Sequence, residues 1–249
     1  MARSREQATS SAMERDDSPT RIAQDLLVAC KRGDPTDRYR TALAEATDAD
    51  LQQVREDQQT GLAFWLNCYN AGTQLLLEER PGLYESPLRF VRFFNTPAVT
   101  VGGTSLALDR IENGILRGGR SKYGLGYLPK VYVTNFERRY RLDNCDPRIH
   151  FALNCGAESC PAIRAYEPNR VSEQLDLATR SYLDATVEYD SDAGTVLVPR
   201  VFLWFRGDFG GGAGIRELLR SYDAIPDGAT PKLRHNSWDW SKATGKFVE

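Results

Sequence analysis

Long apolar runs are missing from this sequence of 249 residues, and so is a marked excess of charge of either sign. No apolar stretch reaches the roughly 18 residues that a membrane-spanning helix needs, so we expect no membrane span. The 34 acidic and 32 basic side chains nearly cancel and form no long basic stripe, which argues against a nucleic-acid-binding protein. Residues 1–17 lack the apolar middle of a secretory signal, so we expect a disordered tail there and a cytoplasmic protein.

Cysteine and histidine are scarce, with five and two residues. An odd number of cysteines in a reducing compartment favours free thiols, metal ligands or small buried side chains over disulfides. His150, Cys155 and Cys160 nevertheless fall together in the stretch IHFALNCGAESCP. This stretch is therefore the first candidate for a functional site.

The composition changes at about Ser18, where helical patterns begin. We predict N-terminal helices within residues 18–58 and a main domain over residues 59–249. A serine cap followed by proline predicts a helix that begins at Pro19, and a second helix is predicted over residues 36–54. A third helix, from residue 60 to Pro81, is apolar around most of its circumference and should lie in the core.

Fewer strands than helices are predicted. Short strands are expected at AVTV and IHFAL, and TVEYD with TVLVP should form a hairpin around DSDAG. Further helices are expected in TSLALDRIENGILRGG, ending at Gly118, in EPNRVSEQLDLATRSYLDA, and after the glycine run of DFGGGAGIREL. The sequence thus predicts an α+β fold, a predominantly helical single domain with a small, mostly antiparallel sheet.

The glycine run does not indicate a phosphate-binding loop. It lacks the GK[ST] ending that would place a lysine on the phosphates and a hydroxyl on magnesium. We interpret it as a flexible turn and predict no cofactor.

Polar residues interrupt two otherwise apolar helices. Asn67, Asn70 and Gln74 share one face of the third helix, where buried amides must find hydrogen-bond partners. They either tie loops to the core or line a site. Glu112 and Arg117 either hold a ligand or an opposing loop, or belong to a solvated face.

The spacing around His150 limits what its thiols can do. If residues 149–154 form a strand, His150 and Asn154 share a face, and Cys155 lies up to about 16 Å from His150 at ~3.3 Å per residue. Only a chain reversal at Gly156 can bring a thiol, above all Cys160, beside the imidazole. A thiolate next to a histidine would be nucleophilic, whereas the alternative is two small buried cysteines beside a core histidine.

A metal site is a third interpretation of the same stretch. Cys145, His150, Cys155 and Cys160 recur every five residues and are ligand types that zinc prefers. They lack the close spacing of a CxxC pair, and an extended strand would splay them apart. We predict no metal site.

Several motifs together resemble the domain of unknown function 547 family. They are LAFWLNCYNAGTQLLL, RIENGILR, DPRIHFALNCGAESCPAIRAY, VFLWFRGDFGG and WDWS, in this order over about residues 60–241. In the family pattern Cys68 occupies a variable place and Cys145 lies outside the motifs. The family's frequent ending YDWSLN is changed here to WDWSKAT.

The resemblance favours a site because polar and thiol residues are concentrated in the motifs. The first hypothesis is a thiol-dependent hydrolase or acyl transferase in which His150, Cys155 and Cys160 are catalytic and Asn67, Asn70, Asn154, Glu112 and Arg117 bind substrate. The alternative is a non-catalytic protein-interaction module in which the same cluster is structural. The expected partner is an unidentified small molecule or protein, and neither nucleic acid nor a membrane.

Overall fold

The computed structural model describes residues 17–85 and 87–248. The predicted disordered tail, residues 1–17, lies outside this range except for Asp17. The described part of the chain is mainly helical and contains two small sheets, so the predicted α+β class is confirmed. None of its helices combines the length and apolar character needed to cross a membrane.

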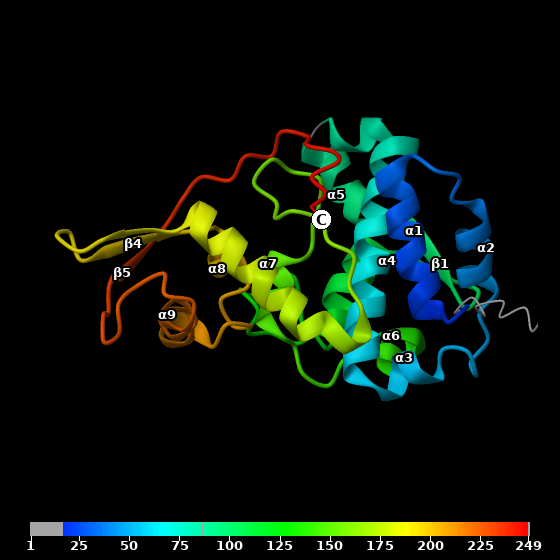
Figure 1. The fold of residues 1–249 in the computed structure, drawn as a ribbon, viewed down its shortest axis with the longest axis horizontal. Coiled ribbons are helices and arrows are strands. Elements are labelled where there is room, and N and C mark those ends of the chain that lie inside the picture. The colour runs from blue at the N-terminus through cyan, green and yellow to red at the C-terminus, as the bar shows by residue number, and fades with distance from the viewer. Residues whose placement is uncertain (1–16, 86, 249) are drawn as a thin grey trace, which may run out of the picture.

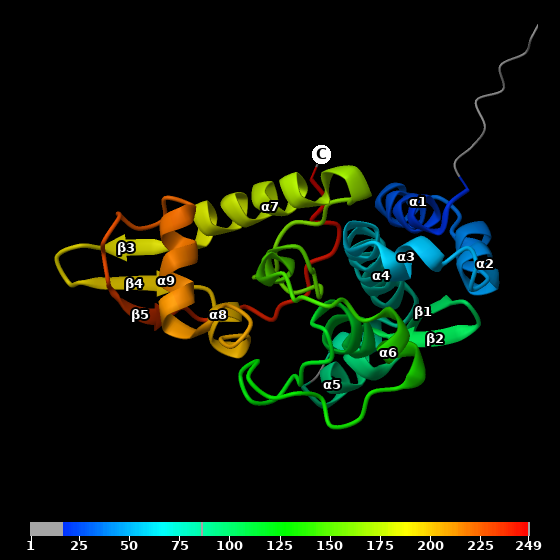
Figure 2. The same ribbon diagram turned by 90° about the horizontal axis from the view of Figure 1, so that it is seen from below.

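The elements divide into two groups joined by one long helix. The first group contains α1 (Pro19–Arg32), α2 (Asp37–Glu45), α3 (Gln52–Glu56), α4 (Gln58–Glu79), η1 (Pro81–Tyr84), α5 (Pro87–Asn95), β1 (Pro97–Val101), β2 (Thr104–Ala107), η2 (Arg110–Leu116) and α6 (Asn135–Tyr140). The chain continues through η3 (Pro147–Phe151), η4 (Pro168–Arg170) and α7 (Val171–Thr186). The second group contains β3 (Glu188–Asp190), β4 (Thr195–Val198), α8 (Val201–Trp204), α9 (Gly211–Ser221) and β5 (Lys232–His235). Figures 1 and 2 show the two groups on opposite sides, with α7 running between them.

Helix α4 is the centre of the first group. The Asp57 carboxylate caps it by accepting the backbone N–H of Thr60 at 2.7 Å, and all residues from Gly61 to Leu77 are buried. Helix α1 packs against α4; Ser18 caps its start, and Gly33, with a φ of 69°, follows its end. The predicted helix at Pro19 and the predicted core helix up to Pro81 are thus confirmed. In both, the caps and the apolar pattern agree with the packing of the helix.

Two predicted helices are wrong in extent. Residues 36–54 break into α2 and α3 because the Asp50 carboxylate accepts the N–H and the hydroxyl of Thr47, at 2.7 and 2.6 Å, and forms a turn. In TSLALDRIENGILRGG the first residues pair with β1 as strand β2. Only the later part is helical, as the π-helix η2, and Gly118 follows its end with a φ of 64°.

The strand predicted at IHFAL is also wrong. Pro147 opens the 3-10 helix η3, and the Asp146 carboxylate accepts the backbone N–H of Arg148 at 3.0 Å. These are helix-start signals, and they prevail over the short alternation of apolar residues. His150 therefore extends from a helical turn, and the separation calculated for an extended chain does not apply.

The second group has its own hydrophobic cluster. The predicted hairpin is confirmed as β3 and β4, and β5 adds to β4 in parallel, a strand that the sequence did not reveal. Val196 and Val198 of β4 pack with Phe202 of α8 and Ile215 of α9, separately from the larger cluster around α4.

The chain beyond β5 returns to the middle of the molecule. Residues 237–248, which we call the strap, run along residues 156–163 (Figure 1). The backbone N–H of Glu158 donates to the Ser241 carbonyl at 2.9 Å, and that of Ile163 donates to the Lys246 carbonyl at 2.7 Å. The strap therefore fixes the segment that carries Cys160.

Candidate functional site

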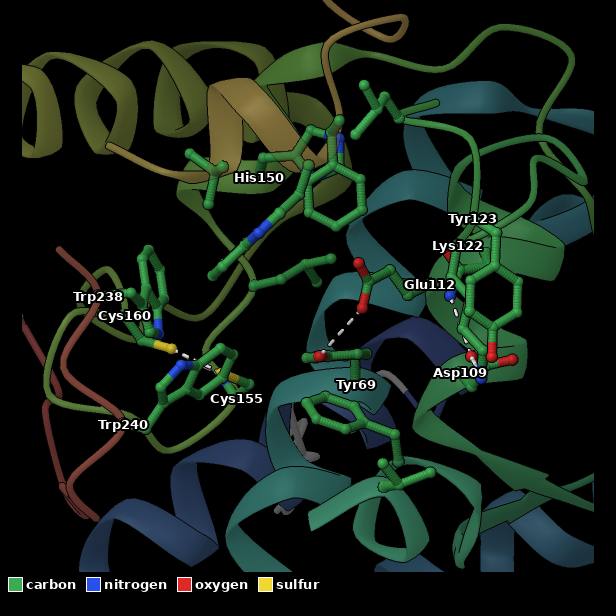
Figure 3. Close-up of a pocket in the computed structure, with 18 of the residues that line it drawn as sticks. Tyr69, Asp109, Glu112, Lys122, Tyr123, His150, Cys155, Cys160, Trp238 and Trp240 are labelled. Carbon is green, nitrogen blue, oxygen red and sulfur yellow. Dashed lines mark hydrogen bonds and ion pairs between the residues drawn. The ribbon is translucent and has the colours of Figure 1, made fainter. Parts of the chain in front are cut away.

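A cavity of about 550 Å³ has walls from both hydrophobic clusters (Figure 3). Tyr69 of α4 and Glu112 of η2 come from one side, and Val201 and Trp204 of α8 come from the other. Four of the residues predicted for the site line this cavity: Glu112, His150, Cys155 and Cys160. The other four do not belong to its lining: Asn67, Asn70, Asn154 and Arg117.

The two cysteines of the cavity wall form a thiol pair. Their Sγ atoms are 2.8 Å apart, and the backbone N–H of Cys155 also donates to the Cys160 sulfur at 3.3 Å. In Figure 3 this pair lies beside Trp238 and Trp240, with Tyr69 and Glu112 across from it. The predicted chain reversal is thus present, and it brings the cysteines to each other.

The two thiols differ in acidity. Burial acts to raise the pKa of Cys160, but the Cys155 thiol, the backbone N–H groups of Cys155 and Ala157, and the charge of Lys246 outweigh it and lower this pKa. The pKa of Cys155 is raised well above its usual value by its hydrogen bond to Cys160 and by burial. These directions favour Cys155 as the hydrogen-bond donor and Cys160 as the thiol that ionises first.

The loop between the cysteines depends on Gly156 and Asn154. Gly156 has a φ of 87°, and a Cβ atom there would lie 2.7 Å from the Cδ1 atom of Leu77, so any other residue would be strained and would displace Leu77. The Asn154 side chain accepts the N–H of Gly156 at 2.8 Å and donates to the Pro161 carbonyl at 2.6 Å. Asn154 thus closes the loop from inside the protein.

The two predicted asparagines of α4 hold the chain on either side of this loop. Asn70 accepts the N–H of Asn154 and donates to the Ala152 carbonyl, both at 3.0 Å. Asn67 makes the same pair of bonds to the backbone of Tyr166, at 2.9 and 2.8 Å. These contacts support the structural alternative for both residues, and a contact with substrate stays a prediction.

His150 contacts a carboxylate instead of a thiol. Its Nε2 atom lies 2.9 Å from the Oδ2 atom of Asp208, and its ring stacks on Phe205 at 3.9 Å between centroids. None of the described hydrogen bonds joins it to Cys155 or Cys160. Burial lowers the pKa of His150 although Asp208 opposes this shift, so the ring is neutral near pH 7 and donates its Nε2 proton.

Asp208, which the sequence analysis missed, does not line the cavity but binds the lining residue His150. Arg117 binds it through both carboxylate oxygens, at 2.6 and 3.1 Å, and Arg120 adds a contact at 2.8 Å. Burial acts against ionisation, but the bonds from His150 and Arg117 outweigh it and hold the pKa of Asp208 well below its usual range. The signal available in the sequence was only that the motif VFLWFRGDFGG contains this carboxylate.

One group of potential metal ligands is present among the described residues. Cys145, His150 and Asp208 each offer a ligand atom, and these atoms lie within 4.8 Å of one another. Arg117 and Arg120 already contact both oxygens of Asp208, so their charges oppose a cation there. Cys155 and Cys160 are not part of this group.

Glu112 is the carboxyl group of the cavity wall whose proton affinity is changed most. Burial raises its pKa to about 7, with Arg117 opposing, and Tyr69 donates its hydroxyl proton to the Oε2 atom at 3.2 Å. Glu112 therefore exchanges a proton near neutral pH, a property that its sequence position alone did not reveal.

A comparison with known families matches residues 51–183, more than half of the chain, to the model described as Protein of unknown function, DUF547. This range contains α4, η2 and the thiol pair, and it ends before Asp208 and the strap. No curated protein and no solved structure matches the chain. The chain belongs to the DUF547 family, whose function is unknown.

Proposed function

We propose that the protein is a thiol-dependent hydrolase or acyl transferase in which Cys160 is the nucleophile. The observation that carries this proposal is the thiol pair in the cavity wall, where two sulfur atoms lie 2.8 Å apart, within hydrogen-bond distance. A thiolate that accepts hydrogen bonds from a thiol and from backbone N–H groups is present at lower pH than an ordinary cysteine.

In this proposal Glu112 supplies the acid and base chemistry. The Cys160 thiolate forms a bond to the acyl carbon of an ester, amide or thioester, and the leaving group takes the proton of Glu112. Water then attacks the resulting thioester and gives a proton back to the Glu112 carboxylate. This second step releases the carboxylic acid product and restores the Cys160 thiolate. With an alcohol, amine or thiol in place of water, the same step is an acyl transfer.

Trp238 offers a hydrogen-bond donor to the carbonyl oxygen of the substrate. Its Nε1 atom is buried and has no acceptor among the described residues, and Figure 3 shows its indole beside Cys160. A carbonyl oxygen that gains negative charge during the attack would satisfy this donor.

The first test is the pH dependence of iodoacetamide labelling at each cysteine, measured by mass spectrometry on the native protein. Cys160 should label at lower pH than Cys145, whose pKa burial raises to about 12 and which serves as the internal standard. If Cys160 labels only after unfolding, the proposal is wrong.

The second test compares variants in the hydrolysis of activated esters and thioesters. Cys160→Ser should abolish turnover, and Glu112→Gln should reduce it roughly a hundredfold or more. Trp238→Phe keeps the aromatic wall but removes the donor, so it should lower the rate by roughly a hundredfold. If His150→Ala, and not Glu112→Gln, removes the pH dependence of turnover, the base is His150, as the sequence suggested.

The alternative function, an interaction module, has one observation in its favour. The loop between η2 and α6 exposes the apolar side chains of Tyr127, Leu128, Val131 and Tyr132. An interaction module would form no acyl-enzyme with activated thioesters. Detection of a covalent acyl group on Cys160 by mass spectrometry therefore separates the two functions.

A further inference from the structure

Exposed apolar side chains surround the opening of the thiol cavity. Val91, Tyr123, Leu125 and Trp240 all line the cavity, yet they are 60%, 72%, 43% and 44% exposed. They come from helix α5, from the loop after η2 and from the strap. Single exposed apolar residues are common, but four in the lining of one cavity form a cluster, which we call the rim.

Leu125 occupies this rim in a backbone conformation that disfavours it. Its φ is 56°, between Gly124 at 80° and Gly126 at 83°, and its carbonyl accepts the backbone N–H of Gly207 at 2.7 Å. A leucine in this left-handed conformation is strained because its Cβ atom crowds the backbone, whereas glycine adopts it without strain. The chain thus carries a leucine side chain at the rim where glycine would be the more stable choice.

The interior of the cavity continues the apolar surface of the rim. Its walls include Phe94, Leu153, Pro161, Val201 and Phe205. Asp109, a charged group in the wall, is paired with Lys122 at 2.8 Å, and Glu112 binds Tyr69. The walls therefore favour an uncharged apolar ligand that approaches the thiol pair with its polar end.

We propose that the cavity binds an unbranched aliphatic chain, so that the substrates of the thiol site are esters, amides or thioesters of aliphatic acids. This inference rests on the proposed function for its assignment of the acyl group, while the binding of the chain can be measured without catalysis. A flexible chain fits because it can follow an uneven apolar lining of aliphatic and aromatic side chains and extend to the exposed residues of the rim.

The test is a binding series of straight-chain primary amides, from propanamide to decanamide, on the native protein and on Cys160→Ser. Three of the four tryptophans, Trp204, Trp238 and Trp240, line the cavity, so their fluorescence reports occupancy. Affinity should rise by about fourfold for each added methylene, the value expected when a CH₂ group leaves water. Affinity that is independent of chain length, or that is higher for benzamides of equal carbon number, would overturn the proposal.

Leu125→Gly tests the rim with little risk to folding, because glycine relieves the backbone strain at this position. It should weaken decanamide binding several-fold and leave propanamide binding unchanged. Val131→Gly is the matched control, since Val131 is fully exposed on the same loop and does not line the cavity. Equal effects of both variants on decanamide would contradict the proposal.

The outcomes distinguish this inference from the proposed function. If decanamide binds with the expected length dependence but Cys160 forms no acyl-enzyme, the ligand class is supported and the proposed function fails. If an acyl-enzyme forms equally well from acetyl and decanoyl thioesters, the function stands and the aliphatic specificity fails.

Discussion

The Nε2 atom of His150 lies 2.9 Å from the Oδ2 atom of Asp208, which joins η3 to the turn between α8 and α9. The same carboxylate binds Arg117, so one buried group connects three segments of the chain. Asp208→Asn should lower the free energy of unfolding by about 3–5 kcal/mol, because it leaves the guanidinium of Arg117 buried without its counter-charge.

Urea unfolding of both proteins, followed by circular dichroism, measures this effect. Asp223→Asn is the control, since Asp223 is an exposed aspartate that follows α9. If Asp208→Asn lowers the free energy of unfolding no more than this control does, Asp208 does not hold the segments together.

The raised pKa of Glu112 predicts a pH dependence of stability with a definite sign. The folded protein keeps this proton up to about pH 7, whereas the unfolded chain loses it near pH 4.3. The contribution of the protonated group is therefore complete below about pH 4 and is lost as the pH rises through 7. Over that interval the native protein should lose up to about 3 kcal/mol relative to Glu112→Gln.

Unfolding free energies of the native protein and Glu112→Gln, measured at several pH values, provide the comparison. Glu217→Gln, which changes an exposed carboxylate of α9, should leave the slope of the native protein unchanged. A difference between the native protein and Glu112→Gln that stays constant with pH would contradict the assignment.

The distance of 2.8 Å between the sulfur atoms of Cys155 and Cys160 predicts that a mild oxidant joins them. The disulfide should close within the molecule, remove two hydrogen atoms and block iodoacetamide labelling of both residues. Because the closed loop is short, the gain in stability should be only about 2 kcal/mol. A non-reducing peptide map after treatment with oxidised glutathione identifies the product. Finding mainly mixed disulfides with glutathione would argue against the close pairing.

Asn70→Ala should destabilise the protein by roughly 2–4 kcal/mol, because it leaves the N–H of Asn154 and the carbonyl of Ala152 without partners in the core. Since these bonds position the loop that carries the thiols, labelling of Cys160 by iodoacetamide should also begin only at a higher pH than in the native protein. Asn144→Ala, an exposed change, should affect neither property. Unchanged labelling in a folded Asn70→Ala protein would show that the loop with Cys155 and Cys160 keeps its conformation without the bonds from Asn70.

The sequence predicts best where local and tertiary preferences agree. Helices α1 and α4 carry caps and apolar patterns that match their packing, so both could be foreseen. At IHFAL the alternation of apolar residues suggested a strand, but Pro147 and Asp146 start a 3-10 helix. The orientation of His150 that was expected from the strand is therefore wrong.

The site was predicted only in part for a similar reason. The grouping of His150, Cys155 and Cys160 was visible because these residues are close in sequence and rare. Asp208 follows 58 positions after His150, and its role depends on the packing of α8 and the following turn, which no local pattern reports. A contact between Arg117 and an opposing loop was one of the alternatives, but its burial was not predicted, because burial is a property of the assembled protein.

The strap is synthesised after the two cysteines that it covers, Cys155 and Cys160. Residues 237–248 leave the ribosome long after residues 155–160, and they supply the backbone partners and two tryptophans that cover the thiol loop. During translation the nascent chain therefore presents Cys155 and Cys160 without this cover. The protein itself covers the pair only when the strap docks.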